Sequence, residues 1–469
     1  SSPGDSMVGM EALSYYFPRY SIKAEEYVAA WGYFGGRGIR EKTVAGYDED
    51  EVTMALAAAS VVSTGEELGY LATATFGGPR LSTTLSTALG LESVRKADFT
   101  GSTNASGEAL LSCFDYVEAT GNRALLVTGD LPRASPEDTL EHRLGAAATA
   151  ILISPDGGLQ VEEVATHTQE EMGELFLDPG GRRRGLEVVE MAPEVVRQSV
   201  QPVLSGSKRR LKVACHEPDG RFAQRALAGL VKPSHIRGGV VELSGDTSCS
   251  SPFLALMETL KNSKEGDDLL LITYGGGSSV AVTLGVRSRP SISPAPRKAL
   301  RSPRIYLNYL RYAQFRRFLS SKEPPAETSM GAYISVPSYL ETIEERYRLV
   351  ASKCTECDRL HFPPRFVCLD CGGRSFRREP LSGRGEVYAY TVIARGSSPA
   401  EFREQQDLVG EYGVCLIQLE EGPRIVTQLT DCDPGEEGIG TPVECVLRRI
   451  YRQEGIVRYG YKFRPLRRV

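Results

Sequence analysis

The clearest chemistry in the sequence comes from four cysteines that form two Cys-x-x-Cys pairs. Ten residues separate the pairs, which consist of Cys354, Cys357, Cys368 and Cys371. Four thiolates on two such knuckles close a tetrahedral zinc site that leaves no position for water or substrate. The spacing therefore predicts structural Zn²⁺, with His361 between the pairs outside the ligand set; a redox dithiol is the weaker alternative.

A second group of reactive residue types lies at the start of a helical pattern. Small hydroxyl and amide side chains occur at Ser102, Thr103, Asn104 and Ser106, and an apolar helical pattern follows them to about residue 121. A helix N-terminus is electropositive and has unpaired N–H groups, so it suits an oxyanion and activates a nucleophile. The alternative is a plain N-cap, since Ser and Thr commonly begin helices without any other role.

Alternating strands and helices must position this loop. From residue 7 to 155 nearly continuous apolar runs, such as 68–75, 123–130 and 144–153, alternate with helical segments. Such strands indicate a sheet that is covered on both faces. Residues 156–288 repeat this outline, and both halves end in a strand, a glycine-containing turn and a further strand. We therefore predict an α/β fold built from a duplicated unit.

The rest of the chain has a different pattern. Residues 289–345 are predicted to be a linker with helices, because Ser, Pro and Arg are frequent before residue 303. Residues 346–380 contain the cysteine pairs and are predicted to be a zinc ribbon. Residues 381–469 contain five short segments of period two, separated by turns. Five short strands are typical of a small all-β barrel of the OB type.

Composition excludes several classes of function. Charged residues make up 25% of the 469 residues, and the net charge of −5 gives no reason to expect a nucleic-acid partner. No run of 18 apolar residues occurs, so we expect no membrane-spanning segment. Paired cysteines without a visible secretory signal indicate metal binding rather than disulfides, so we expect a cytoplasmic protein.

The C-terminal region carries several dense motifs. They are Tyr347-Arg-Leu, the two cysteine pairs, Phe362-Pro-Pro-Arg, Gly385-Glu-Val-Tyr-Ala-Tyr-Thr-Val, Cys432-Asp-Pro and Tyr459-Gly-Tyr-Lys-Phe-Arg-Pro. Together they resemble the zinc-ribbon and OB-fold proteins of the DUF35 type, which are associated with acyl-CoA enzymes. Such modules accompany thiolases and hydroxymethylglutaryl-CoA synthases, so the resemblance implies a separate thiolase as partner and a role in holding CoA.

The N-terminal region carries weaker motifs in a persuasive order. They are the segments 47–55 and 98–112, His216-Glu-Pro-Asp-Gly-Arg, Gly245-Asp-Thr-Ser and Tyr274-Gly-Gly-Gly-Ser. This order resembles the hydroxymethylglutaryl-CoA synthase branch of the thiolase superfamily, fused here to its companion module. The resemblance implies duplicated thiolase-type βαβαβ layers, an acyl-CoA thioester as substrate and a homodimer formed through this region.

The same resemblance implies site residues. In that family a Cys at the start of a buried helix is acylated, a Glu acts as base, a His polarises the second acyl-CoA and an Asn assists. His216 matches the His, Asp246 takes the Asn position, and the Glu position falls near Thr73-Ala-Thr, where no carboxylate occurs. The Cys position falls on Ser106 or on Thr103, depending on which part of the motif is matched. Cys113 lies further into the helix and is expected in the core.

Three explanations for the missing cysteine remain open. Ser106 stands for an engineered replacement of a natural Cys; the enzyme uses hydroxyl or non-covalent chemistry, as cysteine-free aldolase relatives do; or the site has lost catalysis and keeps only acyl-CoA binding. A Ser hydroxyl is a weaker nucleophile than a Cys thiol unless a base is adjacent.

The leading hypothesis is an acyl-CoA-handling enzyme that forms or cleaves a carbon–carbon bond. Backbone N–H groups near Ser106 and in the turn formed by Gly275, Gly276, Gly277 and Ser278 would hold the developing charge, with His216 as acid or base. The alternative is a non-catalytic scaffold that binds acyl-CoA and docks a separate thiolase through its ribbon and barrel.

Overall fold

The computed structural model describes residues 8–62, 68–170, 175–177, 183–185, 191–206, 211–236, 239–290, 292, 294–319, 335–453 and 456–466. The chain forms two compact units. The first comprises Ser1–Ala45, Asp50–Ser86 and Gly90–Tyr312, and the second comprises Gly46–Glu49, Thr87–Leu89 and Ala313–Val469. Residues 320–334 of the predicted linker lie outside the described ranges. Within those ranges, no helix is both long enough and apolar enough to cross a lipid bilayer.

The first unit contains most of the helices and strands. Its strands are β1 (Gly9–Tyr16), β2 (Tyr20–Lys23), β3 (Glu41–Val44), β4 (Leu68–Ala74), β5 (Arg95–Phe99), β6 (Arg123–Asp130), β7 (Ala147–Ser154), β8 (Leu159–Thr168), β9 (Leu175–Leu177), β10 (Arg183–Gly185), β11 (Leu211–Cys215), β12 (Asp268–Gly275), β13 (Ser278–Val286) and β14 (Ile305–Tyr306). Its helices are α1 (Ala24–Trp31), α2 (Glu51–Val62), α4 (Ala105–Thr120), α5 (Thr139–Arg143), α6 (Met191–Gly206), α7 (Phe222–Ala226), α8 (Val241–Ser244), α9 (Ser251–Leu260) and α10 (Pro296–Leu300), with short 3₁₀ turns η1 (Pro233–His235) and η2 (Ser248–Ser250). Helices α3 (Ser82–Leu89) and α11 (Tyr309–Phe315) have residues in both units.

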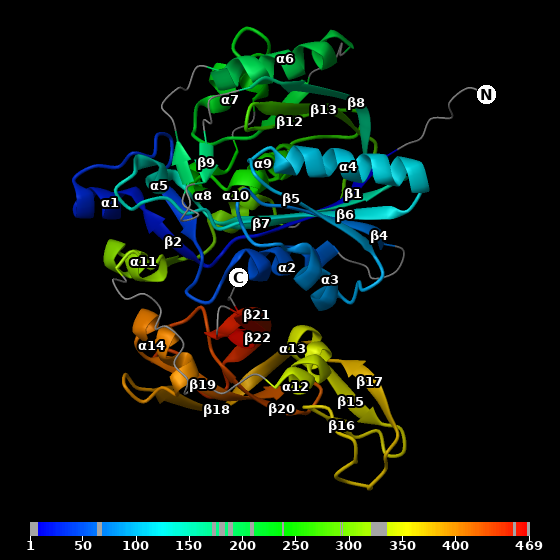
Figure 1. Ribbon diagram of the computed structural model, residues 1–469, viewed down its shortest axis with the longest axis vertical. Coiled ribbons are helices and arrows are strands. Elements are labelled where there is room, and N and C mark those ends of the chain that lie inside the picture. The colour runs from blue at the N-terminus through cyan, green and yellow to red at the C-terminus, as the bar shows by residue number, and fades with distance from the viewer. Residues whose placement is uncertain are drawn as a thin grey trace. The chain divides into compact units, whose positions relative to one another are not determined.

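The first unit is built in five layers (Figure 1). Helix α6 packs on β8 and β13, helices α4 and α9 lie in the middle, and α2 covers β1, β6 and β7 from the other side. Every residue of α9 is buried, as expected for a helix enclosed between the two halves of one nine-stranded sheet. The layered α/β architecture expected from the sequence is therefore confirmed.

The two halves of this unit share one strand order. In the first half the sheet order is β1-β7-β6-β4-β5, so the strands, counted along the chain, lie in the order first, fifth, fourth, second, third. The second half repeats this order as β8-β13-β12-β11 and has an isolated parallel bridge, Val213 to Ile236, where the third strand would pair. The predicted duplication is thus present in the topology.

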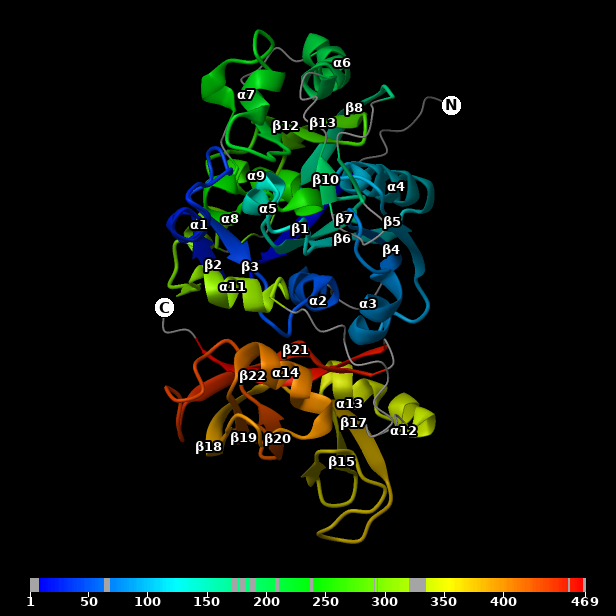
Figure 2. The same cartoon turned by 60° about the vertical axis from the view of Figure 1, so that its left-hand side comes forward.

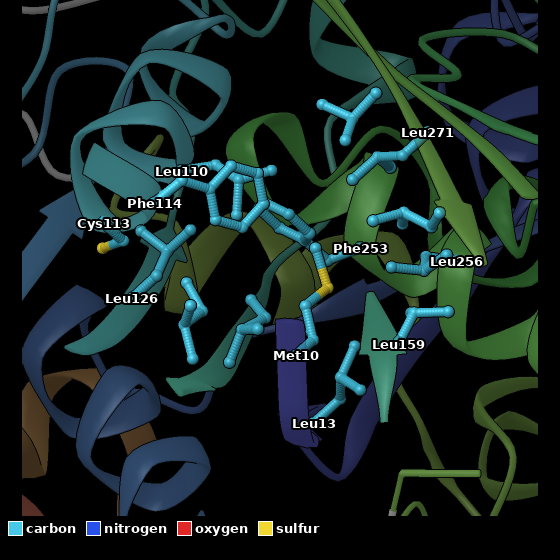
Figure 3. Close-up of a cluster of buried hydrophobic side chains, with 14 of the residues drawn as sticks. Met10, Leu13, Leu110, Cys113, Phe114, Leu126, Leu159, Phe253, Leu256 and Leu271 are labelled. Atoms are coloured by element: carbon cyan, nitrogen blue, oxygen red, sulfur yellow. The ribbon is translucent and has the colours of Figure 1, made fainter. Parts of the chain in front are cut away.

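The two central helices and the strands that face them form the core between the two halves of the sheet (Figure 3). Leu110 and Phe114 of α4 and Phe253 and Leu256 of α9 are buried there with Met10 of β1. Helix α4 ends where Gly121 takes the left-handed conformation and its N–H bonds the carbonyl oxygen of Val117. Cys113 lies in this core, as expected, and burial raises the pKa of its thiol.

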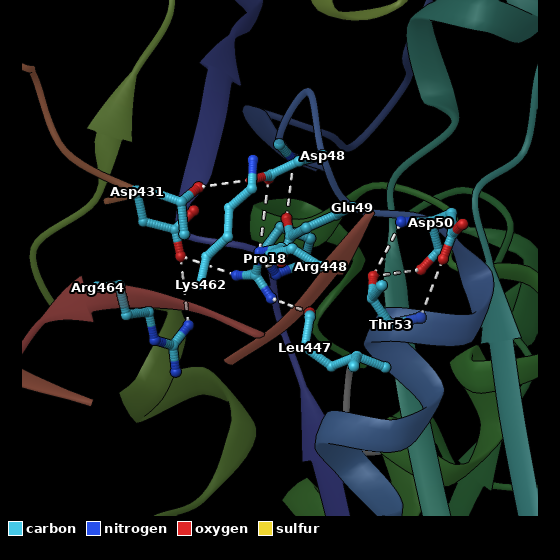
Figure 4. Close-up of polar contacts among 12 residues, drawn as sticks. Pro18, Asp48, Glu49, Asp50, Thr53, Asp431, Leu447, Arg448, Lys462 and Arg464 are labelled. Carbon is cyan, nitrogen blue, oxygen red and sulfur yellow. Dashed lines mark hydrogen bonds and ion pairs between the residues drawn. The ribbon is translucent and has the colours of Figure 1, made fainter. Parts of the chain in front are cut away.

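Helix α2 begins with a reciprocal cap (Figure 4). The N–H of Thr53 donates to Asp50 Oδ1 at 3.0 Å, and the N–H of Asp50 donates to Thr53 Oγ1 at 2.9 Å. This arrangement satisfies N–H groups that a helix start otherwise leaves unpaired.

The second unit combines a zinc ribbon with a barrel (Figure 2). Its elements are α12 (Val336–Glu341), α13 (Ile343–Arg348), β15 (Val350–Cys354), β16 (Leu360–His361), β17 (Phe376–Pro380), β18 (Arg384–Ile393), η3 (Ala400–Phe402), α14 (Arg403–Val409), β19 (Tyr412–Leu419), β20 (Arg424–Gln428), β21 (Pro442–Gln453) and β22 (Ile456–Pro465). The five strands β18 to β22 form one sheet, and a bridge between Leu429 and Phe463 nearly closes it into an OB-like barrel.

A buried ion cluster lies inside the second unit (Figure 4). Arg448 Nη2 is 3.0 Å from Glu49 Oε1 and 2.9 Å from Asp431 Oδ2, and Lys462 Nζ is 2.9 Å from Asp48 Oδ2. Burial lowers the pKa of Lys462, although Asp48 opposes this shift. These contacts hold the segment Gly46–Glu49 against β21 and β22, although it lies almost 400 residues before them in the chain.

Candidate functional site

The loop before α4 is tied to the end of β12. The Thr103 hydroxyl donates to the carbonyl oxygen of Tyr274 at 2.6 Å. The Asn104 side chain accepts from the Thr273 hydroxyl at 2.5 Å and donates to Ser278 Oγ at 3.1 Å. Both residues are buried, so the two segments form one polar cluster at the N-terminus of a central helix.

The glycines of the β12–β13 turn allow this close approach. A Cβ on Gly275 would lie 2.0 Å from Thr103 Oγ1 and 2.8 Å from the Thr103 backbone nitrogen. A Cβ on Gly276, whose φ is +60°, would lie 2.8 Å from Ser102 Cβ. The predicted Gly275–Ser278 turn and the predicted Thr103 position are therefore adjacent.

Ser106 has a different environment from Thr103. It is fully buried in the first turn of α4, and its hydroxyl donates to the carbonyl oxygen of Thr103 at 3.2 Å. This is a local bond within the helix start, as Ser commonly makes. Of the two positions proposed for the nucleophile, Thr103 is the one in contact with the glycine turn.

His216 follows β11 directly and is buried. Its backbone N–H donates to the carbonyl oxygen of Ile272 at 2.9 Å, so His216 and Thr103 both attach to the last residues of β12. The next residue, Glu217, receives the N–H of Phe222 at 2.8 Å and donates its own N–H to Ser251 Oγ at 3.0 Å. Burial raises the pKa of the Glu217 carboxyl to about 8.

Asp246 is held by the segment before β7. Its N–H donates to the carbonyl oxygen of Arg143 at 2.7 Å, and its carbonyl oxygen accepts from the N–H of Gly145 at 2.9 Å. Because this pairing occupies residues 143–145, the strand predicted from residue 144 begins only at Ala147. The Asp246 carboxylate accepts the N–H of Ser248 at 2.8 Å.

Two residues at this cluster were missed from the sequence. Cys249 Sγ lies 3.7 Å from the carbonyl oxygen of Ser102, and its N–H donates to Asp130 Oδ2 at 3.1 Å. Asp130 Oδ1 in turn accepts from Thr75 Oγ1 at 2.9 Å and from the N–H of Phe76 at 3.0 Å. A signal existed for both, since Asp130 ends an apolar strand and Cys249 directly follows the Gly245-Asp-Thr-Ser motif.

The four cysteines form a separate site in the second unit. Cys354 Sγ and Cys371 Sγ are 3.7 Å apart, Cys357 Sγ and Cys368 Sγ are 3.5 Å apart, and all four sulfurs lie within 4.8 Å of one another. An ion bonded tetrahedrally to four sulfurs at its usual distance needs sulfur separations of about 3.8 Å. The residues therefore fit a zinc ion.

The surroundings of one of the four cysteines, Cys368, favour a thiolate. The backbone N–H of Cys371 lowers the pKa of the Cys368 thiol to about 6. His361, which the sequence placed outside the ligand set, has Nε2 at 3.3 Å from Cys368 Sγ. An imidazole N–H in this place can stabilise a metal-bound sulfur without itself binding the metal.

Comparisons with known proteins find different relatives for the C-terminal and the N-terminal regions of the chain. Residues 343–377 match the family described as ChsH2, rubredoxin-like zinc ribbon domain, and residues 378–448 match the ChsH2, C-terminal OB-fold domain. A DUF35 domain-containing scaffold protein of Pyrococcus furiosus is 39% identical over 139 residues, which are 29% of this chain and 97% of that protein.

The N-terminal region has different relatives. A hydroxymethylglutaryl-CoA synthase of Methanosarcina barkeri is 26% identical over 344 residues, which are 66% of this chain and 97% of that protein. Among solved structures, an HMG-CoA synthase complexed with CoA has a TM-score of 0.61 at 16% identity and covers 71% of this chain and 96% of its own. The HMG synthase of the curacin biosynthetic pathway has a TM-score of 0.59 at 20% identity, with 66% and 88% covered. At such identities these structures establish the fold.

Proposed function

We propose that this chain, which belongs to the DUF35 domain-containing scaffold family, acts as an enzyme on acyl-CoA thioesters. Its N-terminal region is similar to hydroxymethylglutaryl-CoA synthases. The reaction forms or cleaves the carbon–carbon bond beside the thioester carbonyl. The observation that carries this proposal is the contact of Thr103 with the Gly275 turn, at the N-terminus of a central helix.

The cluster offers the groups that such a reaction needs. Negative charge develops on the thioester oxygen when an enolate or a tetrahedral intermediate forms, and backbone N–H groups around Thr103 and Gly276 would stabilise it. The Thr103 hydroxyl, or less directly that of Ser106, would accept the acyl group or position it. His216 would donate or accept a proton at the second acyl group, with Asp246 in the supporting position.

The zinc ion and the dimer belong to the same proposal. Cys354, Cys357, Cys368 and Cys371 would hold Zn²⁺ as a structural ion, because four protein ligands leave no place for substrate.

A homodimer would form through the first unit, where β5 is the last strand of its sheet. Pairing at such an edge covers N–H and C=O groups that otherwise face solvent.

A second candidate function is that of a scaffold without catalysis, which docks a separate thiolase. Relatives of the C-terminal region are named scaffold proteins, and the second cysteine knuckle carries exposed apolar side chains. Phe366 is 89% exposed and Leu369 is 68% exposed. Exposed apolar residues grouped in this way favour a protein partner.

Mass spectrometry of the intact protein after incubation with acetyl-CoA and acetoacetyl-CoA tests these functions. Under the proposal, CoA esters are consumed, and an acyl adduct maps to Thr103 or Ser106 if the reaction is covalent. Consumption without any adduct supports a non-covalent, aldolase-type reaction. If no ester is consumed while binding persists, the enzymatic proposal is rejected and the scaffold function takes its place.

A further inference from the structure

Strand β4 supplies no carboxylate at its carboxyl end. A glutamate from another element lies beside the carboxyl ends of β4 and β6. Glu51 is the first residue of α2. A Cβ on Gly129, next to the end of β6, would lie 3.0 Å from the Glu51 carbonyl oxygen. The start of α2 therefore packs directly against the end of β6.

The Glu51 side chain extends toward Thr75. A Cβ on Gly78 would lie 3.2 Å from Glu51 Cγ, 3.5 Å from Glu51 Cδ and 2.7 Å from Thr75 Oγ1. The Glu51 carboxyl and the Thr75 hydroxyl therefore both border the space that Gly78 leaves open. This is the place where the sequence offered only Thr73-Ala-Thr and no carboxylate.

Direct contacts connect this place to the loop that holds Thr103. The N–H of Thr75 donates to the carbonyl oxygen of Phe99, and the N–H of Gly101 donates to that of Phe76, both at 3.1 Å. Segments 75–76 and 99–101 therefore run side by side. Asp130 joins the N–H of Phe76 to that of Cys249, whose sulfur contacts Ser102.

The charges around Glu51 favour proton exchange near neutral pH. Burial raises the pKa of its carboxyl to about 7, and the charges of Asp50 and Asp130 add to this effect while Arg133 opposes it. A general base is most effective when its pKa is close to the working pH.

We propose that Glu51 is the catalytic base that removes the proton from the carbon next to the thioester carbonyl, a role that rests on the function proposed above. The C–H bond breaks and its proton goes to a Glu51 carboxylate oxygen. The electron pair forms the enolate double bond, and the charge goes to the carbonyl oxygen. The enolate carbon then attacks the acceptor carbonyl, whose π-electron pair moves to its oxygen and takes a proton from His216. In the cleavage direction His216 removes that proton, the carbon–carbon bond breaks to give the enolate, and Glu51 returns a proton to the enolate carbon.

Hydrogen–deuterium exchange at the acetyl group of acetyl-CoA tests this step alone, because it requires no second substrate. In D₂O the full-length protein is expected to exchange the methyl protons of acetyl-CoA for deuterium, at a rate that rises through about pH 7. NMR measures this rate. Glu51→Gln should lower the rate by about 100-fold or more, as loss of a general base does, and Glu51→Asp should restore part of it. Glu25→Gln, an exposed acid in the first turn of α1, is the matched control and should exchange as the parent does.

A second variant guards against a folding defect. Gly78→Ala places a methyl group against Thr75 and the Glu51 side chain, so it should slow exchange while CoA-ester binding, measured by calorimetry, persists. If the parent consumes CoA esters and Glu51→Gln does so equally fast with the same pH profile, the Glu51 assignment is overturned and the proposed function stands. If the parent neither exchanges protons nor consumes any ester, both fail together.

Discussion

The Thr103 hydroxyl donates a hydrogen bond of 2.6 Å to the carbonyl oxygen of Tyr274, 171 residues further along the chain. This bond joins the start of α4 in the first half to the end of β12 in the second half. The proton of this hydroxyl is donated to the Tyr274 carbonyl oxygen. The hydrogen bond must therefore break before the Thr103 oxygen can lose its proton and attack a thioester.

Replacing Thr103 should separate the roles of hydroxyl and thiol. Thr103→Val keeps the shape and removes the donor, so we expect at least a tenfold loss of acyl-CoA turnover with the fold intact. Thr103→Cys should form a covalent acyl adduct, because a thiol has a far larger ionised fraction near neutral pH. Peptide mapping after incubation with acetyl-CoA measures this. Ser106→Ala is the control, and an equal loss in that variant would argue against Thr103.

Gly275 should not tolerate a side chain. The Cβ of Gly275→Ala would meet Thr103 Oγ1 at 2.0 Å, a distance that forces the loop or the turn to move. We expect a loss of activity of about 100-fold, as a misplaced reactive group produces, and a lower melting temperature. Gly239→Ala, whose Cβ would make ordinary contacts at 3.7 Å, should behave as the parent. Similar behaviour of the two variants would contradict the close approach.

The cysteine site should bind one zinc ion per chain. Native mass spectrometry of the purified protein should detect the ion, and Cys357→Ser should remove most of it, because a closed site needs all four thiolates. A strong chelator should lower the melting temperature of the parent but not of this variant. Cys432→Ser, at a cysteine outside the site, should retain the ion. A disulfide between the pairs with no metal would instead support the redox alternative.

The buried ion cluster should be sensitive to loss of one charge. Arg448→Met leaves Asp48, Glu49 and Asp431 with fewer cationic partners, and removal of one partner of a buried pair costs about 3–5 kcal/mol. Thermal unfolding should detect an early transition. Arg377→Met removes ion pairs at exposed residues and should cost about 1 kcal/mol or less. Equal effects would mean that burial adds nothing to the Arg448 contacts.

Ionisation of Glu51 should reduce stability. Burial first, and then Asp50, raise its pKa from 4.5 to about 7. Between these values the folded state retains a proton that the unfolded chain releases, so stability falls as the pH rises and becomes level above about 7. Glu51→Gln lacks this loss. Its stability relative to the parent should rise by about 1–2 kcal/mol between pH 5 and pH 8, after allowance for solvent screening.

Urea denaturation of both proteins across this pH range measures the difference. Because Glu217 also has a raised pKa, only the difference between variant and parent isolates Glu51. A difference that stays constant with pH would mean that Glu51 ionises as freely in the folded protein as in the unfolded chain.

Local pattern was sufficient for much of the fold. The two Cys-x-x-Cys pairs predicted a site that needs only two short knuckles, and the four sulfurs do converge. The apolar runs and glycine turns predicted duplicated α/β layers, and the five segments of period two predicted the barrel. These features depend on residues close together in the chain, where the side-chain period reports which face is buried.

The tertiary structure alone decided which residues meet. The sequence left Thr103 and Ser106 equivalent, and only the approach of Gly275 separates them. It offered no carboxylate near Thr75, and Glu51 arrives there because α2 crosses the end of β6. It gave no reason to group Asp48 with Arg448, 400 positions apart in the numbering. Such pairings follow from how sheets and helices pack over long sequence separations, which no local period encodes.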